Sequence, residues 1–448
     1  MNRISREQIR PVFTTLSSIA VVVGIVVGIG IFRLPPIVAS NSASEFQFIA
    51  FWVAGGFISL MGALCYAELA SSKPDAGGEY HFLSNAFGSS VGFLFTWGRM
   101  TVIQTGSIAL IAFILGDYAS LILDLGLHSS TIYAILTIVV LTGVNLLGTD
   151  PSRRIQNVLT ASIILMLVVL SLFAFISAES LPSVSNSASP GDGLFSGGSV
   201  GAAMIFVLLT YGGWNEAAYL SGEIQDVKRN MMKVLLFGIF IITALYVLVN
   251  VAYLQVLGLE HLQNSETVGA ELTTQLFGNE STFIVAIIVI ATALSTANAT
   301  IITGARTNYA LGRDFPLLRF MGRWKSSNNT PVNALIVQGG IALILVGLGA
   351  WSQQAVQTMV DYTAPVFWFF LLLTTVTLFI FRYRSETDQR PFSVPLYPVT
   401  PVLFLIACGY MLYSSLAFTG TGALAGVAIL LAGLPVYFWA KFHKTNSN

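Results

Sequence analysis

Long apolar segments constrain the fold of this chain more than any other feature of its sequence. A membrane-spanning helix takes roughly 20 mainly apolar residues. Twelve stretches have about that length, at approximately 13–40, 47–72, 88–119, 131–148, 155–178, 199–222, 231–257, 281–311, 332–351, 357–381, 397–417 and 420–440. Only 9% of the residues are charged, against about 25% in soluble domains. Because backbone amides in lipid need partners within their own segment, we predict an all-α membrane protein with twelve transmembrane helices.

The positions of the basic residues predict how these helices are oriented. Eighteen of the 21 Lys and Arg residues fall at the termini or in the even-numbered connections, and Arg33, Arg99 and Arg306 lie within or beside spans. The connections on the other side contain none, including the Ser-rich one at 179–198 and the acidic one at 258–280, which is expected to contain a short helix. Since cytoplasmic loops carry the excess of Lys and Arg, we expect a multi-pass protein of the cell membrane with cytoplasmic termini.

Composition excludes several classes of function. A formal net charge of zero leaves no basic excess for nucleic acid. The four histidines are scattered and no HExxH motif is present, so we expect neither an enzyme nor a bound metal. Cys65 and Cys408 lie inside apolar segments, so we expect no disulfide-linked partner subunit, and membrane lipid is the expected surrounding.

Glycines interrupt two of the predicted helices near mid-membrane. The first span reads Val27-Gly28-Ile29-Gly30 ahead of Pro35-Pro36, and the sixth reads Tyr211-Gly212-Gly213-Trp214. Glycine in a helix interior lowers stability, although small residues also allow helices to pack closely. Interrupted segments at corresponding positions in two halves point to the binding site of an inverted-repeat transporter. As a matched pair, the two segments favour broken helices.

A helix broken at mid-membrane presents two poles to a ligand. The N–H groups of residues 28–30 would be free at the start of an outer half-helix and would attract an anion. Carbonyl groups freed near Ile25 and Val26, and near Leu209 and Gly212, would attract a cation. A ligand with a carboxylate and an ammonium fits both poles, and an α-amino acid is the simplest such ligand.

Four stretches of sequence together form a family pattern. They are Gly28-Ile29-Gly30-Ile31-Phe32; Leu64 to Leu69 with Pro74, Gly77-Gly78 and Tyr80; Tyr211 to Asn215 with Glu223 and Arg229-Asn230; and Gly304-Ala305-Arg306 with Tyr309 to Leu311, Arg313-Asp314, Arg390-Pro391-Phe392 and Pro395-Leu396-Tyr397-Pro398. In this combination, over nearly the whole chain, the sequence resembles the amino acid–polyamine–organocation (APC) superfamily of permeases, in particular its L-type amino acid transporter branch.

The resemblance implies a LeuT-like fold in a single transporter domain covering 1–448. It would contain a five-helix repeat at 13–178, a second, inverted repeat at 199–381 and two additional helices at 397–440, with helices 1 and 6 discontinuous. The substrate-binding residues, from the two poles and the resemblance together, are Ile25, Val26, Gly28, Ile29, Gly30, Leu209, Gly212, Asn215 and Trp368. No cofactor is implied beyond a coupling Na⁺ or H⁺.

Three positions depart from the family pattern. Leu209 stands where an aromatic gate usually covers the substrate, so the gate candidates are Leu209 itself and the neighbouring Phe206 and Tyr211. Ile29 replaces a common Ser and keeps only the backbone donor. Ile163 stands where many members have a Lys in helix five, which leaves either an apolar gap or room for a cation.

Three polar residues are candidates for coupling transport to an ion. Ser295 and Thr296 could supply hydroxyl ligands beside the carbonyls of Gly24 and Val27, although such hydroxyls often bond to carbonyls of their own helix. Glu216 follows the break in the sixth helix, and an ionisable group at that depth is a functional candidate. It could carry a proton, pair with Arg99 or cap the second half-helix.

The function that we predict is secondary transport of neutral L-amino acids by alternating access, as an exchanger or a cation-coupled symporter. The expected pocket wall of Val26, Leu209, Gly212 and Trp368 carries no charge, which disfavours a basic substrate side chain. The alternative is an amine or polyamine transporter that uses Glu216 as the counter-charge. A channel would have no need of two matched helix breaks.

Overall fold

The chain is all-helical throughout the part that the computed structural model describes, residues 11–75, 77–178, 200–265, 268–278, 281–350, 355–384, 390–418 and 420–445. In those residues β pairing is limited to two isolated bridges, Phe13 with Ile224 and Lys325 with Thr330. The predicted all-α architecture is therefore confirmed. The predicted connection at 179–198 lies outside the described residues.

Eleven helical segments of the described chain are long and apolar enough to cross a membrane. They are α1 with α2 (Thr15–Val26 and Gly30–Arg33), α4 (Glu45–Ser72), the run of α6, η1 and α7 (Ser89–Gly98, Arg99–Ile103 and Gln104–Ile122), α8 (Ser129–Leu147), α9 (Thr149–Ala178), α12 (Val227–Leu257), α15 (Thr282–Asp314), α16 (Val332–Gly349), α17 (Ala355–Arg384), α18 (Val399–Phe418) and α19 (Gly420–Thr445). Each overlaps one of the predicted spans, so the protein is a multi-pass membrane protein.

The predicted span at 199–222 is not among these eleven segments because its helix is divided. Helix α10 (Val200–Thr210) ends first, and η2 (Trp214–Glu216) and α11 (Ala217–Leu220) follow after a turn. Gly213 adopts a left-handed backbone conformation with φ 111°, which the interior of an α-helix does not contain. Helix α10 alone is roughly 16 Å long, about half of the hydrocarbon thickness of a bilayer.

The first span is also divided. Helix α1 ends at Val26, where the N–H of Val27 bonds to the carbonyl of Val23 at 2.7 Å. Helix α2 begins at Gly30, and α3 (Pro35–Ser40) follows at once with Pro35 at its first position. Proline suits the start of a helix because its missing N–H has no intrahelical partner there.

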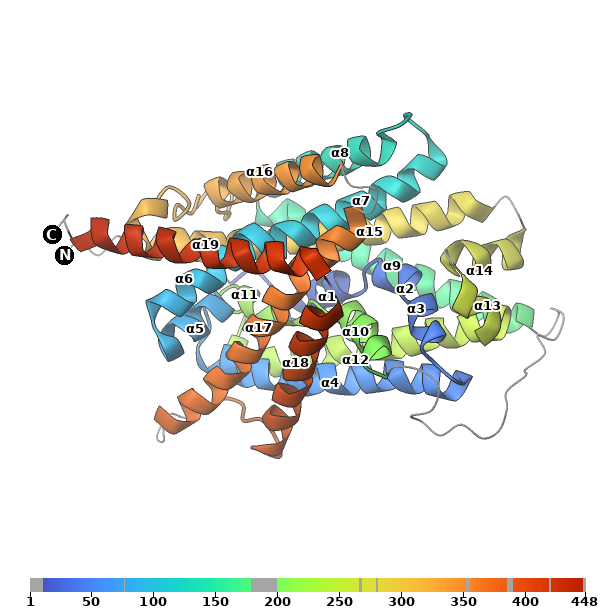
Figure 1. Cartoon of the computed structure of the whole chain (residues 1–448), viewed down its shortest axis with the longest axis horizontal. Helices are drawn as coiled ribbons and strands as arrows, with labels where there is room; N and C mark the ends of the chain where they lie inside the picture. Colours follow the sequence, from blue (N-terminus) through green and yellow to red (C-terminus); the bar gives the residue numbers. More distant parts are fainter. Residues whose placement is uncertain are drawn as a thin grey trace.

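Short helices cover the two ends of the bundle. The connection at 258–280, for which one short helix was predicted, contains α13 (Leu259–Asn264) and α14 (Val268–Phe277). Figure 1 shows α13 and α14 at the end of the bundle where α3 lies. Helix α5 (Glu79–Phe87) and the C-terminal end of α19 lie at the opposite end.

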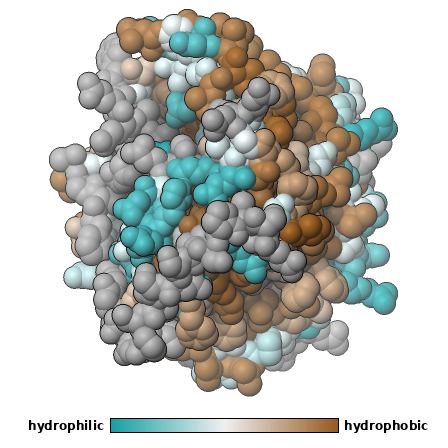
Figure 2. Space-filling model, turned by 90° about the vertical axis from the view of Figure 1, so that its right-hand side faces the viewer, coloured by the Kyte–Doolittle hydropathy of each residue, from teal (hydrophilic) through white to brown (hydrophobic). Residues whose placement is uncertain are grey.

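Apolar side chains occur both inside the bundle and on its outer surface. Helix α12 packs along α4, α1 and α9. On the outward side of α9, Leu165 is 65% and Ile176 is 75% exposed. In Figure 2, apolar residues cover much of one side of the molecule, while hydrophilic residues gather near the middle of the view. An outer surface of this kind suits lipid, in which exposed apolar side chains carry no hydration cost.

Candidate functional site

A cavity of about 240 Å³ lies where the two divided helices meet. All nine residues predicted to bind the substrate line it: Ile25, Val26, Gly28, Ile29, Gly30, Leu209, Gly212, Asn215 and Trp368. Arg33 at the end of α2 and Leu34 just after it extend the lining, and residues of α7, α15 and α17 complete the wall. The structure thus brings together residues from five separate parts of the chain.

The backbone of the first break offers N–H groups to this cavity. Past the end of α1, the N–H of Gly28 donates to the carbonyl of Val26 at 2.7 Å. In the described part of the chain, the next two N–H groups, those of Ile29 and Gly30, donate to no protein acceptor. Successive free N–H groups attract an anion, and a carboxylate can accept from both.

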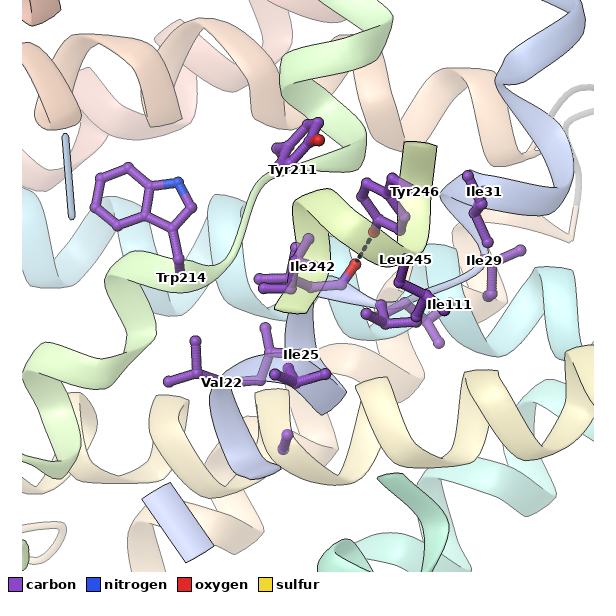
Figure 3. Packing of buried hydrophobic residues seen from close by; sticks show 14 of the residues in the cluster. Val22, Ile25, Ile29, Ile31, Ile111, Tyr211, Trp214, Ile242, Leu245 and Tyr246 are labelled. Atoms are coloured by element: carbon purple, nitrogen blue, oxygen red, sulfur yellow. Dashed lines mark hydrogen bonds between the residues drawn. The ribbon is translucent and has the colours of Figure 1, made fainter. Parts of the chain in front are cut away.

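Tyr246 binds the carbonyl groups of both breaks. Its hydroxyl oxygen lies 2.5 Å from the carbonyl oxygen of Val26 and 3.0 Å from that of Thr210, so one proton is shared between two acceptors. In Figure 3 the Tyr246 hydroxyl points toward the stretch of backbone between Ile25 and Ile29. The Val26 carbonyl, which was predicted to attract a cation, therefore already has a partner within the protein.

The other carbonyl of this turn that was predicted to attract a cation belongs to Ile25. In the described residues the Ile25 carbonyl accepts no hydrogen bond from outside its helix. It also lacks the usual bond from the N–H four residues later, because Ile29 lies beyond the end of α1. In the second break the Leu209 carbonyl accepts from the N–H of Gly212 at 3.1 Å. Of the carbonyls predicted to attract a cation, those of Val26 and Leu209 therefore bond to groups of the protein, whereas that of Ile25 does not bond outside its helix in the described residues.

Aromatic cover for the cavity comes from α17. Phe367 and Trp368 both line it, and their ring centroids lie 5.2 Å apart in an edge-to-face arrangement. Of the three gate candidates, only Leu209 lines the cavity. Tyr211 is fully buried and donates to the Trp52 carbonyl at 3.0 Å, and Phe206 packs outside the lining. Their positions do not favour a gate role for Tyr211 or Phe206.

A network of neutral side chains occupies the region between α1, α9 and α15, where Ser295 and Thr296 were candidates for holding a cation. Thr296 donates to the Gly24 carbonyl at 3.1 Å and lines the cavity. Gln156 donates from its amide nitrogen to Ser295 at 2.8 Å, and Thr160 donates to the Ala20 carbonyl. Nearby on α9, Ile163 is buried in the apolar core.

Glu216 lines the cavity and is bound to Arg99. The Arg99 Nη2 lies 2.5 Å from the Glu216 Oε2, and both side chains are buried. Of the three roles considered for Glu216, pairing with Arg99 is the one that the structure shows. The negative charge of Glu216 is therefore neutralised beside the cavity.

Several lining residues were not identified from the sequence. They are Gln104, Ser107 and Ile111 of α7, Thr300 of α15 and Phe367 of α17. Gln104 and Ser107 are polar residues within an apolar span, which is a detectable signal. The sequence contains no such signal for the role of Tyr246, because a tyrosine in an apolar helix is equally typical of ordinary packing.

Comparison with known proteins gives the family. A family model described as amino acid permease matches residues 13–437. The chain belongs to the amino acid permease family. This match, together with the relatives described next, confirms the resemblance to APC permeases of the L-type branch, and the protein is a transporter and not an enzyme.

Curated relatives of this permease cover nearly its whole length. The b(0,+)-type amino acid transporter 1 of Mus musculus is 28% identical over 96% of this chain and 88% of its own length. The serine/threonine exchanger SteT of Bacillus subtilis is 25% identical over 96% of this chain and 97% of its own. The large neutral amino acids transporter small subunit 2 of Homo sapiens is 27% identical, covering 96% of this chain and 80% of its own.

Proposed function

We propose that this permease transports neutral L-amino acids across the cell membrane by alternating access. The observation that carries the proposal is the pair of poles in one cavity, with the free N–H groups of Ile29 and Gly30 on one side and the Ile25 carbonyl on the other. In this arrangement the substrate carboxylate accepts from the N–H groups and its ammonium donates to the carbonyl. Neither contact needs a charged side chain.

The rest of the cavity supports a neutral substrate side chain. Leu209, Ile111, Phe367 and Trp368 give it apolar walls. Its described lining contains two ionisable side chains, Arg33 and Glu216, and the latter is paired with Arg99. The relatives named for large neutral amino acids and for serine and threonine support the same substrate class.

The proposal includes a specific architecture. The span at 199–222 completes twelve crossings, and the chain forms a single transporter domain with a LeuT-like repeat at 13–178, its inverted counterpart at 199–381 and two further helices at 397–440. Both termini face the cytoplasm, as the distribution of Lys and Arg supports. The protein works without a disulfide-linked subunit, which the burial of Cys65 and Cys408 supports.

The amine or polyamine alternative depends on the charge of Glu216. An ammonium ligand would have to compete with the Arg99 guanidinium, which lies 2.5 Å from that carboxylate. Breaking a buried pair leaves an uncompensated charge and costs about 3–5 kcal/mol. The geometry therefore favours the amino acid over the amine.

Uptake into proteoliposomes tests the proposed function. The purified protein is reconstituted and given labelled neutral, basic and acidic L-amino acids and a polyamine, first with unlabelled substrate inside and then with an imposed Na⁺ or H⁺ gradient. We expect uptake of neutral L-amino acids. Stimulation by internal substrate marks an exchanger, and stimulation by a gradient marks a symporter. Uptake of the polyamine alone would contradict the proposal and support the alternative.

A further inference from the structure

Two buried carboxylates share one guanidinium beside the cavity. Arg99 opens the π-helical segment η1 and lies 2.5 Å from Glu216, as above, while its Nη1 lies 3.9 Å from the Oε2 of Glu79. Its Nε donates to Thr307 at 3.1 Å. All three ionisable side chains are less than 10% exposed. In the described chain, Arg99 is the only cation that forms an ion pair with either acid.

Glu79 is held by three donors from different elements. The hydroxyl groups of Tyr66 on α4 and Tyr219 on α11 each hydrogen-bond to one of its carboxyl oxygens. The amide nitrogen of Asn215 donates to its Oε1 at 3.3 Å. Because Asn215 also lines the cavity, the Glu79 carboxyl is one hydrogen bond away from the substrate site.

The charges of this cluster do not balance when both acids are ionised. Two carboxylates and one guanidinium carry a net charge of −1, and an uncompensated buried charge is costly. Glu216 has the close contact with Arg99, so Glu79 is the acid whose charge is less well compensated. Burial raises the pKa of the Glu79 carboxyl above its ordinary value, although Arg99 and the two phenols act in the opposite direction.

Within the described residues, the two helices that pack most extensively against α5 offer Glu79 no second cation, and Arg313 at the end of α15 pairs with Asp75 and Asp314. Helix α6, which packs against it, contains no ionisable residue over Ser89–Gly98. On α17, which also packs against α5, Arg382 pairs with Glu68 and Arg384 bonds to the Asn85 carbonyl. Proton binding is therefore the remaining way to neutralise the cluster.

We propose that Glu79 is a proton-binding site that couples proton uptake to substrate binding in the cavity. The inference rests on the proposed function and concerns how it is driven. A hydronium ion from the solvent transfers a proton to a carboxylate oxygen of Glu79: one O–H bond of the hydronium breaks, an O–H bond on Glu79 forms, and a water molecule is released. The Glu79–Asn215 hydrogen bond then loses its charge assistance, so the Asn215 amide is released toward the substrate. Protonation in this way favours substrate binding, and the proton moves with the substrate.

Substrate affinity as a function of pH tests this coupling. The dissociation constant of a neutral amino acid is measured on the purified wild-type protein over about pH 5–8, a range above the ordinary pKa values of surface carboxylates. Affinity should be highest at low pH and should fall, by up to about tenfold per pH unit for one linked proton, as pH rises through the pKa of Glu79. Glu79→Gln, which resembles the protonated acid, should give high affinity and a flat profile.

A matched control is Glu223→Gln. Glu223 is also buried, but it forms a balanced one-to-one pair with Arg306, with Oε2 3.0 Å from the Arg306 Nη2. Its substitution should lower stability and leave the pH dependence of affinity in place. A folded Glu79→Gln protein that keeps the wild-type profile would overturn the inference, while neutral amino acid transport itself would stand.

Proton uptake by the wild-type protein gives a second readout that needs no variant. Substrate is added to protein in weakly buffered solution with a pH-indicator dye, at several pH values across the same range. We expect net uptake of up to about one proton per bound substrate. Substrate binding without proton exchange at every pH would also overturn the inference. Absence of binding to any neutral amino acid would instead count against the proposed function.

Discussion

At the scale of single residues, Tyr246 connects the two halves of the site. It lies on α12, and its hydroxyl contacts a carbonyl of the first break and one of the second. The ring is fully buried and packs edge to face with Tyr211, with ring centroids 5.0 Å apart. Both carbonyls lack an intrahelical partner because their helices have ended. The Tyr246 hydroxyl bonds to both of them, and the Val26 carbonyl also accepts from the N–H of Gly28 at 2.7 Å.

Removal of that hydroxyl should weaken substrate binding. Tyr246→Phe keeps the ring but removes the hydroxyl that bonds to the carbonyls of Val26 and Thr210. We expect this loss to lower the free energy of unfolding by about 1–3 kcal/mol. Because both breaks lose a restraint, we also expect substrate affinity to fall by about tenfold. Thermal unfolding in detergent and substrate binding by calorimetry measure the two effects.

Tyr253→Phe is the control for this change. Tyr253 lies on the same helix, is equally buried and donates to the Ile31 carbonyl at 3.3 Å, beyond the break. Its loss should cost less stability and leave affinity near that of the wild type. Equal loss of affinity in both variants would mean that Tyr246 acts through general packing of α12.

The sequence predicted the backbone part of the site better than its side-chain part. Residues 25–30 could be identified because glycines in an apolar span have few explanations. Tyr246, Gln104 and Phe367 could not, since their roles arise from helix packing that no local pattern encodes. The Val26 carbonyl was predicted to be free for the same reason, because its partner lies 220 residues further along the chain.

At the scale of elements, the two breaks fit against each other. A methyl group on Gly213 would lie 2.5 Å from the Ile25 Cγ2, and one on Gly30 would lie 3.0 Å from the Thr210 Cγ2. The glycines thus allow the breaks to approach closely as well as ending the helices. Helix breaking and close packing, which were alternatives for the sequence pattern, both apply here.

Helix α1 depends on another glycine for its contact with α9 and α15. A methyl group on Gly24 would lie 2.3 Å from the Gln156 Nε2 and 2.4 Å from the Thr160 Oγ1, which are hydrogen-bonded to each other. Gly24→Ala should therefore destabilise the protein by about 1–3 kcal/mol in thermal unfolding, because the network cannot shift without losing bonds.

Gly143→Ala provides the comparison for Gly24→Ala. Gly143 lies inside α8, and a methyl group there would meet no atom within 4 Å. Because alanine favours helix more than glycine does, this variant should be unchanged or more stable by up to about 1 kcal/mol. If Gly24→Ala were as stable as Gly143→Ala, the proposed tight contact of α1 would be wrong.

At the scale of the whole molecule, the hydropathy of the sequence predicted the order of the helices and nearly all of the membrane-spanning segments. Eleven predicted spans correspond to apolar helical segments long enough to cross a membrane, and these include the divided first span; the span at 199–222, which Gly212 and Gly213 divide, is not among them. Hydropathy measures the length of an apolar stretch, so it counts a divided helix as continuous. The break itself had to be inferred from Gly212 and Gly213.

Orientation in the membrane gives a prediction for the whole molecule. The native cysteines are buried, so single cysteines can be introduced at exposed positions without labelled background. Leu127→Cys, in the connection between α7 and α8, should react with an impermeant maleimide in intact cells. Ser326→Cys, between α15 and α16, should react only after the membrane is opened. The reverse pattern would place the termini outside the cell.

The central claim is that the cavity binds both charged groups of a neutral amino acid. A competition-binding measurement tests this claim most directly. Purified protein loaded with labelled leucine is challenged with unlabelled leucine, with isopentylamine, which lacks the carboxylate, and with 4-methylpentanoate, which lacks the ammonium. We predict displacement by leucine. Neither analogue should displace the label at a hundredfold higher concentration, because each lacks one of the two charged groups that the cavity binds. Displacement by isopentylamine as effective as that by leucine would contradict the account.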